Sequence, residues 1–185
     1  MPSVNFKIVG QLMAVALLST GAAMAQDGDV RNVSFEAGTG EKVGMIRLGL
    51  QGKLPYRWLE RDGKHLGTYW DASVAYWRAS RFENIPGRRQ DIVNIGYTPV
   101  LRYAASNGRG WYVEGGIGVH LLSELYDNNQ RRLSTAFQFG DHLGGGFVYD
   151  NGWDLGFKLQ HFSNGSIKQP NYGVNFLVIK LARPF

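Results

Sequence analysis

Residues 153–164 read WDLGFKLQHFSN, and the order of side chains in this stretch decides the fold. The odd positions hold Trp, Leu, Phe, Leu, His and Ser, whereas the even positions hold Asp, Gly, Lys, Gln, Phe and Asn. Because successive side chains of a β-strand point to opposite faces, one face of such a strand is mostly apolar and the other mostly polar. An amphipathic helix would instead place apolar residues three and four positions apart, so this stretch is predicted to be a strand.

A similar alternation recurs along the chain in eight stretches, which clusters of Gly, Asn, Asp and Pro separate. Most of these stretches are about as long as a tilted barrel strand that crosses a membrane. The predicted strands lie near 31–38, 43–52, 67–78, 91–104, 110–122, 135–149, 153–164 and 173–185. We expect short turns at 38–42 and 150–152, longer polar loops at 79–90, 126–134 and 165–172, and a long loop over 51–66.

The polar faces of these strands carry more charge than the cavity of a soluble, ligand-binding barrel would accept. An ion-paired lumen accommodates such charges, while the apolar faces suit contact with lipid. The charged residues are Glu36, Arg47, Arg102, Glu114 and Lys158. The chain also ends on Phe185, and outer-membrane barrels typically end in an aromatic residue. The sequence therefore predicts an all-β fold, an eight-stranded antiparallel transmembrane β-barrel of the outer membrane.

Residues 1–25 have the features of a cleavable signal peptide. Lys7 precedes an apolar run that is too short to span a bilayer, and Ala23-Met24-Ala25 fits the small-residue pattern before a cleavage site. We therefore expect an exported protein whose barrel domain covers residues 26–185. The chain has no cysteine, and a barrel that closes its own sheet in lipid needs no disulfide.

The formal net charge of the chain is +5, which fits either a mildly basic solvated surface or attraction to an anionic partner. Export argues against nucleic acid, so the expected partners are lipopolysaccharide, with its lipid A phosphates, and the lipids of the outer membrane. Whether the chain also forms a homodimer stays open. No metal or other cofactor is expected, because the sequence contains no H-E-x-x-H, P-loop or G-x-S-x-G motif and its histidines do not cluster.

His161 and Ser163 are the residues of the deciding stretch that can carry chemistry. They share the apolar face with Leu159, and their Cα atoms are about 6–7 Å apart, so a general base could hydrogen-bond its nucleophile there. A polar pair that faces hydrocarbon costs free energy and needs a functional reason, unless the strand has already reached the headgroups. Pairing with the two neighbouring strands is predicted to place Asn175 and Asp141 opposite His161.

The segment HFSNGSIKQPNYGVNF at 161–176 resembles the signature of the PagL lipid A 3-O-deacylases, which are outer-membrane barrels. The upstream segments LGTYWDASVAYW (66–77), VEGGIGV (113–119) and FGDHLGGGF (139–147) are similar to that family too. The resemblance implies a serine esterase that hydrolyses the 3-position acyl ester of lipid A in the outer leaflet. It also implies a Ser–His–Glu triad on the lipid-facing surface.

The resemblance implies a role for individual residues of this segment. Ser163 falls on the nucleophile of the triad, and His161 falls on the general base. Asn164 matches an asparagine that is needed for activity, and Asn171 matches one that contributes to the oxyanion hole. Lys168 is either a solvated side chain or a contact to a lipid A phosphate.

Position 175 departs from the family pattern, because Asn175 stands where the resemblance implies a glutamate. An amide oxygen can orient the imidazole of His161, but it brings no negative charge to stabilise the imidazolium. Two alternatives follow. Asp141, which matches an aspartate of the family, supplies the carboxylate, or Asn175 acts alone and the reaction is slower.

Two other functions compete with the deacylase. A non-enzymatic barrel of the OmpX or OmpA type would serve adhesion or membrane structure, and in it His161 and Ser163 would be replaceable. An acyltransferase such as PagP would need a site that faces the lumen and holds a hydrocarbon chain. The outward parity of the two residues argues against that acyltransferase.

Overall fold

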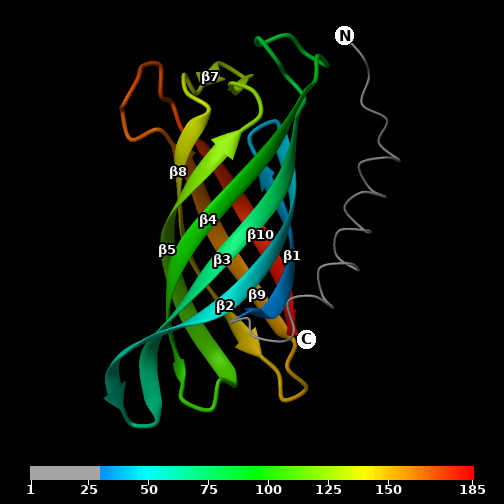
Figure 1. Ribbon diagram of the computed structural model, residues 1–185. Coiled ribbons are helices and arrows are strands. Elements are labelled where there is room, and N and C mark those ends of the chain that lie inside the picture. The colour runs from blue at the N-terminus through cyan, green and yellow to red at the C-terminus, as the bar shows by residue number, and fades with distance from the viewer. Residues whose placement is uncertain (1–29) are drawn as a thin grey trace. The chain divides into compact units, whose positions relative to one another are not determined.

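The computed structural model describes residues 30–185, which form a closed β-barrel (Figure 1). The predicted signal peptide, residues 1–25, lies outside the described residues. Eight long strands close the barrel in the order β1-β10-β9-β8-β5-β4-β3-β2, and β6 pairs with β7 in a separate two-stranded sheet. The strands are β1 (Val30–Gly40), β2 (Val43–Arg61), β3 (Lys64–Ala79), β4 (Gln90–Ala105), β5 (Gly110–Leu122), β6 (Asp127–Asn128), β7 (Arg131–Arg132), β8 (Phe137–Val148), β9 (Asp154–Ser163) and β10 (Val174–Pro184).

The predicted antiparallel barrel is confirmed, but the predicted loop over 51–66 is wrong. β2 and β3 stay paired out to Arg61 and Lys64, so this segment is a hairpin that projects beyond the barrel at the lower end in Figure 1. Asp62 and Gly63 form its turn with φ angles of 51° and 70°, which match the two-residue turns that suit a twisted hairpin. Two register shifts interrupt the pairing and break the alternation by which a strand is recognised.

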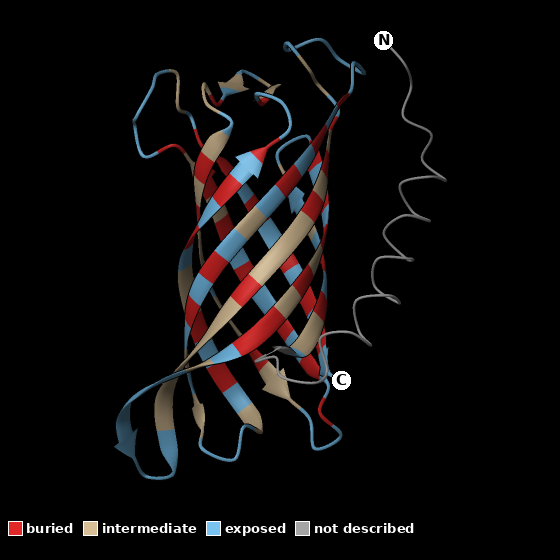
Figure 2. Cartoon of the chain, in the orientation of Figure 1, coloured by how far each residue is buried: buried red, intermediate tan, exposed pale blue. Residues whose placement is uncertain are grey.

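The two faces of the barrel wall differ as the alternation predicts (Figure 2). In β9, the side chains of Leu155, Phe157 and Leu159 are exposed on the outer surface. The alternate residues Lys158 and Gln160 are buried in the lumen. Apolar side chains also cover the outer surface of β4, β5 and β10. Within residues 30–185 there is no helix long and apolar enough to cross a membrane.

Four acidic and four basic side chains form an ion-pair network in the lumen. Glu36 lies 2.7 Å from the ammonium of Lys158 and 2.8 Å from the guanidinium of Arg47. The acids are Glu36, Asp71, Glu114 and Asp154, and the bases are Arg47, Arg102, Lys158 and Lys180. Because each buried charge has an opposite partner within hydrogen-bond or ion-pair distance, the lumen tolerates charge that a dry core would reject.

An aromatic core fills the opposite end of the lumen, where β9 ends and β10 begins. The ring of Trp77 lies 4.7 Å from that of Phe162 and 5.0 Å from that of Phe176, and all three side chains are buried. Burying rings of this size stabilises the fold by several kcal/mol in total, roughly 1.5–3 kcal/mol each. Since Phe162 points inward, its neighbours His161 and Ser163 are turned to the outer surface.

Candidate active site

His161 and Ser163 lie on the outer face at the end of β9, and both side chains are partly exposed. The predicted register is confirmed, because Asn175 of β10 and Asp141 of β8 lie opposite His161 on its two sides. Ser163 pairs with Phe139 of β8. Among the described residues the Ser163 hydroxyl makes no hydrogen bond, so its proton is not committed to another protein group.

Asn175 fixes the protonation of the imidazole. Its Oδ1 lies 2.6 Å from Nδ1 of His161. A side-chain amide oxygen can only accept, so Nδ1 of the neutral ring carries the hydrogen and Nε2 keeps its lone pair. Nε2 is therefore the atom that can take a proton from a nearby hydroxyl.

Gly173 provides the space in which the His161 ring lies. A Cβ atom added to this glycine would be 2.5 Å from Cε1 and 3.2 Å from Nε2 of His161. The φ angle of Gly173 is 66°, in the left-handed region that side chains with a Cβ rarely adopt. The positive φ angle and the closeness of the His161 ring therefore both require glycine at position 173. Sequence reasoning missed this residue, although a glycine directly before a strand was its visible signal.

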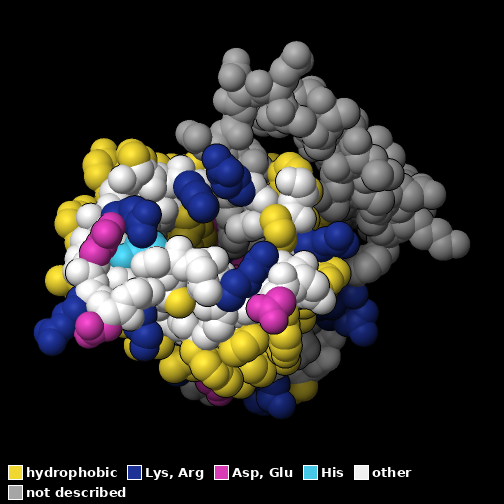
Figure 3. Space-filling view, turned by 90° about the horizontal axis from the view of Figure 1, so that it is seen from below, with side chains coloured by type: hydrophobic (Ala, Val, Ile, Leu, Met, Phe, Trp, Pro, Cys, Tyr) yellow, Lys and Arg dark blue, Asp and Glu magenta, His cyan; other side chains and the backbone are white. Residues whose placement is uncertain are grey.

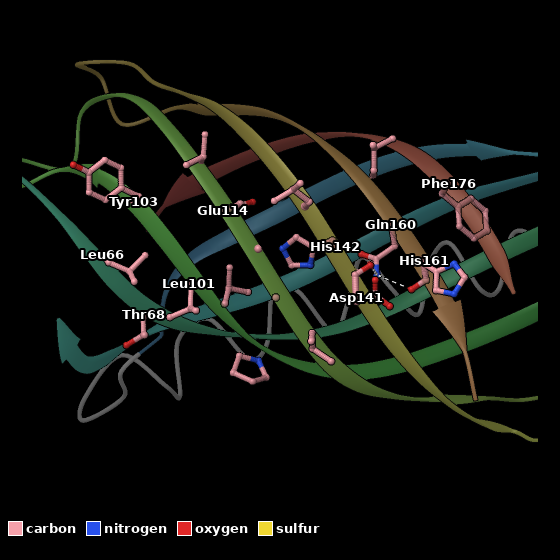
Figure 4. Close-up of a pocket in the computed structure, with 18 of the residues that line it drawn as sticks. Leu66, Thr68, Leu101, Tyr103, Glu114, Asp141, His142, Gln160, His161 and Phe176 are labelled. Atoms are coloured by element: carbon pink, nitrogen blue, oxygen red, sulfur yellow. Dashed lines mark hydrogen bonds between the residues drawn. The ribbon is translucent and has the colours of Figure 1, made fainter. Parts of the chain in front are cut away.

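Asp141 does not hold the imidazole. It lies across from His161 and is half-buried, yet within residues 30–185 its carboxylate has no hydrogen bond or ion pair. Its backbone carbonyl accepts a 3.0 Å hydrogen bond from Gln160 (Figure 4). The partner of Nδ1 in this structure is thus Asn175, and the carboxylate of Asp141 is free to contact something else.

Asn164 holds together the loop that follows β9. It is fully buried, and its Nδ2 donates to the carbonyl of Lys168 at 2.7 Å and to the hydroxyl of Ser134 at 3.2 Å. Its backbone N–H donates to Oδ1 of Asn171 at 3.0 Å. Both amide hydrogens of Asn164 are therefore committed, while the amide group of Asn171 makes no hydrogen bond through Nδ2 within the described chain.

Ser134 ties this loop to the neighbouring one, a contact that the sequence did not predict. Its hydroxyl donates to the carbonyl of Lys168 at 2.7 Å and accepts from Asn164. The backbone adds a bridge between Leu133 and Asn171 and a hydrogen bond from Tyr172 to Arg132. Residues 131–134 thus support the loop 164–173 along its length. The Lys168 ammonium makes no ion pair within residues 30–185.

An apolar groove of about 1060 Å³ begins at His161 and Asn175. It continues along the outer wall past Leu159 and Leu177 of the neighbouring strands, and then past Leu143. Figure 4 shows its far end, where Leu66, Leu101 and Tyr103 come from β3 and β4. His161 and Asn175 therefore lie at the end of a surface that suits a hydrocarbon chain.

Within residues 30–185, no cluster of potential metal ligands lies beside His161 and Ser163. Across the described residues, no three His, Asp or Glu side chains are grouped so that they could hold an ion. His120 and His142 lie on other strands, where His120 contacts Asn94 at 3.0 Å in the lumen. The chemistry available at the outer site is that of an imidazole, a hydroxyl, amides and one carboxylate.

Comparisons with known proteins give one consistent result. The family model for Lipid A 3-O-deacylase (PagL) matches residues 44–184. The chain is 30% identical to the lipid A deacylase PagL of Pseudomonas aeruginosa, over 91% of this chain and 92% of that protein. It is 28% identical to the lipid A deacylase PagL of Bordetella bronchiseptica, over 94% of this chain and 95% of that protein. A crystal structure of the outer membrane enzyme PagL superposes with a TM-score of 0.71 and 27% identity, over 83% of this chain and 99% of that one.

Proposed function

This chain belongs to the PagL family of lipid A 3-O-deacylases, and on that premise we propose that it cleaves the 3-position acyl ester of lipid A with Ser163 as nucleophile and His161 as base. The protein is an outer-membrane β-barrel, so its substrate lies in the same membrane. The observation that carries the proposal is the contact between Asn175 and Nδ1 of His161, which leaves Nε2 as a proton acceptor on the lipid-facing side.

In the first half of the reaction, Nε2 of His161 takes the hydroxyl proton of Ser163 while the serine oxygen attacks the ester carbonyl. The carbonyl oxygen becomes an oxyanion in the tetrahedral intermediate. The intermediate collapses by breaking the bond to the lipid A oxygen, which receives the proton from His161. The acyl group stays bound to Ser163 as an ester.

In the second half, His161 takes a proton from water, and the resulting hydroxide attacks the acyl ester of Ser163. Collapse of the second intermediate returns the proton to the serine oxygen and releases a 3-hydroxy fatty acid.

We assign the oxyanion contact to Asn171, because its amide nitrogen has both hydrogens uncommitted within the described residues. Donors aimed at the oxyanion typically contribute about 2.7–4 kcal/mol each to catalysis. Asn164 stabilises the oxyanion indirectly, through Asn171. The backbone N–H of Asn164 donates to Oδ1 of Asn171 and so fixes the direction in which Nδ2 of Asn171 points.

The apolar groove supports an acyl substrate rather than a water-soluble ester. The ester carbonyl lies at His161 in this arrangement, and the released chain extends past Leu159 and Leu143. Removing a hydrocarbon chain from the bilayer gains no hydrophobic free energy, so the groove positions the chain more than it binds it.

The main competing function is that of a non-enzymatic barrel of the OmpX or OmpA type. Expression of the wild-type chain and of Ser163→Ala in a host that carries lipid A separates the two. We expect lipid A to lose the mass of one hydroxyacyl group only with the wild type, as measured by mass spectrometry. Ser80→Ala is the matched control and keeps the activity, because Ser80 is an exposed serine whose hydroxyl donates to the backbone carbonyl of Lys42. Unchanged lipid A in all three strains supports the structural barrel.

A further inference from the structure

A second cavity, of about 490 Å³, opens at the end of the barrel opposite Ser163. It lies where β9 begins, beside the projecting β2–β3 hairpin and the β4–β5 turn. Six Lys and Arg residues line it, but Asp154 is the one carboxylate among its lining residues. Figure 3 views this face from below and shows Lys and Arg side chains distributed around it, with fewer Asp and Glu side chains among them. The basic residues are Arg31, Lys53, Arg57, Arg102, Arg109 and Arg183.

Acidic groups of the described chain do not neutralise this cavity. Asp154 already contacts Arg102 at 3.1 Å and Lys180 at 3.4 Å. The other lumen acids are likewise paired with lumen bases. Within residues 30–185, Arg31, Lys53 and Arg109 have no acidic partner.

The positive charges of the other two basic residues, Arg57 and Arg183, are only weakly neutralised by neighbouring groups. Arg57 pairs with Glu60 at 3.2 Å, but both side chains are about half exposed or more, where such a pair contributes little. Arg183 stacks over the ring of Trp153 at 5.4 Å, a contact that leaves its charge in place. Like charges around one cavity repel one another, and an anion that enters relieves the repulsion.

The hairpin places this cavity at the level of lipid headgroups. Lys53 and Arg57 line the cavity, whereas Tyr56 and Trp58 do not. The rings of Tyr56 and Trp58 stack at 6.0 Å and are 57% and 48% exposed. An exposed aromatic pair beside basic residues is typical of the membrane–water interface. The connections at this end of the barrel are shorter than most of those at the other end, as is typical of the periplasmic side of outer-membrane barrels, so the neighbouring headgroups belong to the inner leaflet.

From the charge, the volume and the place of this cavity, we infer that it binds a phosphate group. A guanidinium group can donate two parallel hydrogen bonds to two oxygens of one phosphate, and the lysine ammonium adds a compact positive charge. This set of residues therefore suits phosphate better than a carboxylate. The phosphate belongs either to an anionic phospholipid headgroup or to a small soluble phosphate. This site is independent of the ester hydrolysis proposed for Ser163.

The test is calorimetric titration of the folded protein, purified in zwitterionic detergent, at low salt. One arm uses dihexanoyl phosphatidylglycerol, a second uses inorganic phosphate, and dihexanoyl phosphatidylcholine is the neutral reference. The double variant Lys53→Gln with Arg109→Gln removes two charges. Arg61→Gln is the control, because Arg61 lies on the same hairpin, is 87% exposed and does not line the cavity.

We expect the double variant to bind at least tenfold more weakly and Arg61→Gln to bind like the wild type. Binding of both probes identifies the phosphate group itself as sufficient, and binding of the anionic lipid alone identifies the headgroup. Binding of neither probe overturns the inference, as does equal binding by the double variant and the wild type. Because no lipid A is hydrolysed in this experiment, such a failure leaves the deacylase proposal untouched.

Discussion

Oδ1 of Asn175 lies 2.6 Å from Nδ1 of His161, across the antiparallel pair of β10 and β9. The amide thus makes the hydrogen bond that a carboxylate would make at this position, and it holds the ring in the tautomer that leaves the lone pair on Nε2. It does so without a charge. In a serine protease an amide in the acid's place costs about 10⁴-fold because it selects the wrong tautomer. Here Asn175 selects the productive tautomer, so the expected loss of rate comes only from the missing negative charge.

Replacing Asn175 by glutamate should therefore increase the rate. A negative charge beside Nδ1 stabilises the imidazolium that forms in the transition state, and about 1.4 kcal/mol of such stabilisation raises kcat about tenfold. Asn175→Ala should lower kcat, because nothing then fixes the tautomer. Rates on purified lipid A in mixed micelles, followed by mass spectrometry, measure both effects. Equal rates for Asn175→Ala and the wild type would mean that the contact has no role in the reaction.

Gly173→Ala should reduce kcat by at least a hundredfold. The new Cβ atom would lie 2.5 Å from Cε1 of His161 and would displace the ring from its present position. The matched control is Gly108→Ala, since Gly108 has a φ of 70° and no atom within 4 Å of an added Cβ. Both variants carry the same backbone strain, so only the contact with the imidazole differs. Similar activity in the two variants would contradict this account of Gly173.

Ser134→Ala should lower kcat about tenfold and leave KM nearly unchanged. The hydroxyl of Ser134 holds Asn164 and the carbonyl of Lys168, and through them the loop that carries Asn171. Removing this hydroxyl leaves one amide hydrogen of the buried Asn164 without its partner, which costs about 1–3 kcal/mol. Ser134→Thr keeps the hydroxyl and should restore kcat. A rise in KM alone, or the absence of rescue by threonine, would show that Ser134 does not position the oxyanion donor.

Glu36→Gln should destabilise the barrel by about 3–5 kcal/mol, because it leaves the buried charges of Lys158 and Arg47 short of a partner. Urea unfolding in detergent or lipid, followed by tryptophan fluorescence, measures the free energy of unfolding. Arg61→Gln breaks an exposed pair with Asp62 and should cost less than about 1 kcal/mol. Equal losses in the two variants would mean that the lumen network contributes no more than a surface pair.

The barrel and the register of the site could be predicted from the sequence, because the period of two is strict in β9 and β10. The turn that precedes β9 and the length of the loop that follows it then fix which residues of β8 and β10 lie opposite His161. The β2–β3 hairpin could not be predicted, since register shifts between Leu54 and Arg57 and between Trp58 and Arg61 break the alternation.

The contacts that support the site were also beyond sequence reasoning. The bond from Asn164 to Ser134 joins residues far apart in the chain, and no local pattern encodes it. The space that Gly173 leaves for His161 depends on how the loop returns to β10. The choice between Asn175 and Asp141 as the partner of Nδ1 depended on side-chain reach, because both lie opposite His161.

The most direct test of the central claim is covalent labelling of the folded protein with an alkyl fluorophosphonate, followed by peptide mass spectrometry. Such a probe phosphonylates a serine only where a base has activated its hydroxyl. We predict a single label on Ser163 that is lost in His161→Ala, with the barrel still folded. Absence of the label from Ser163 in the wild type, or an undiminished label in His161→Ala, would contradict a Ser163–His161 pair that works at the lipid-facing surface.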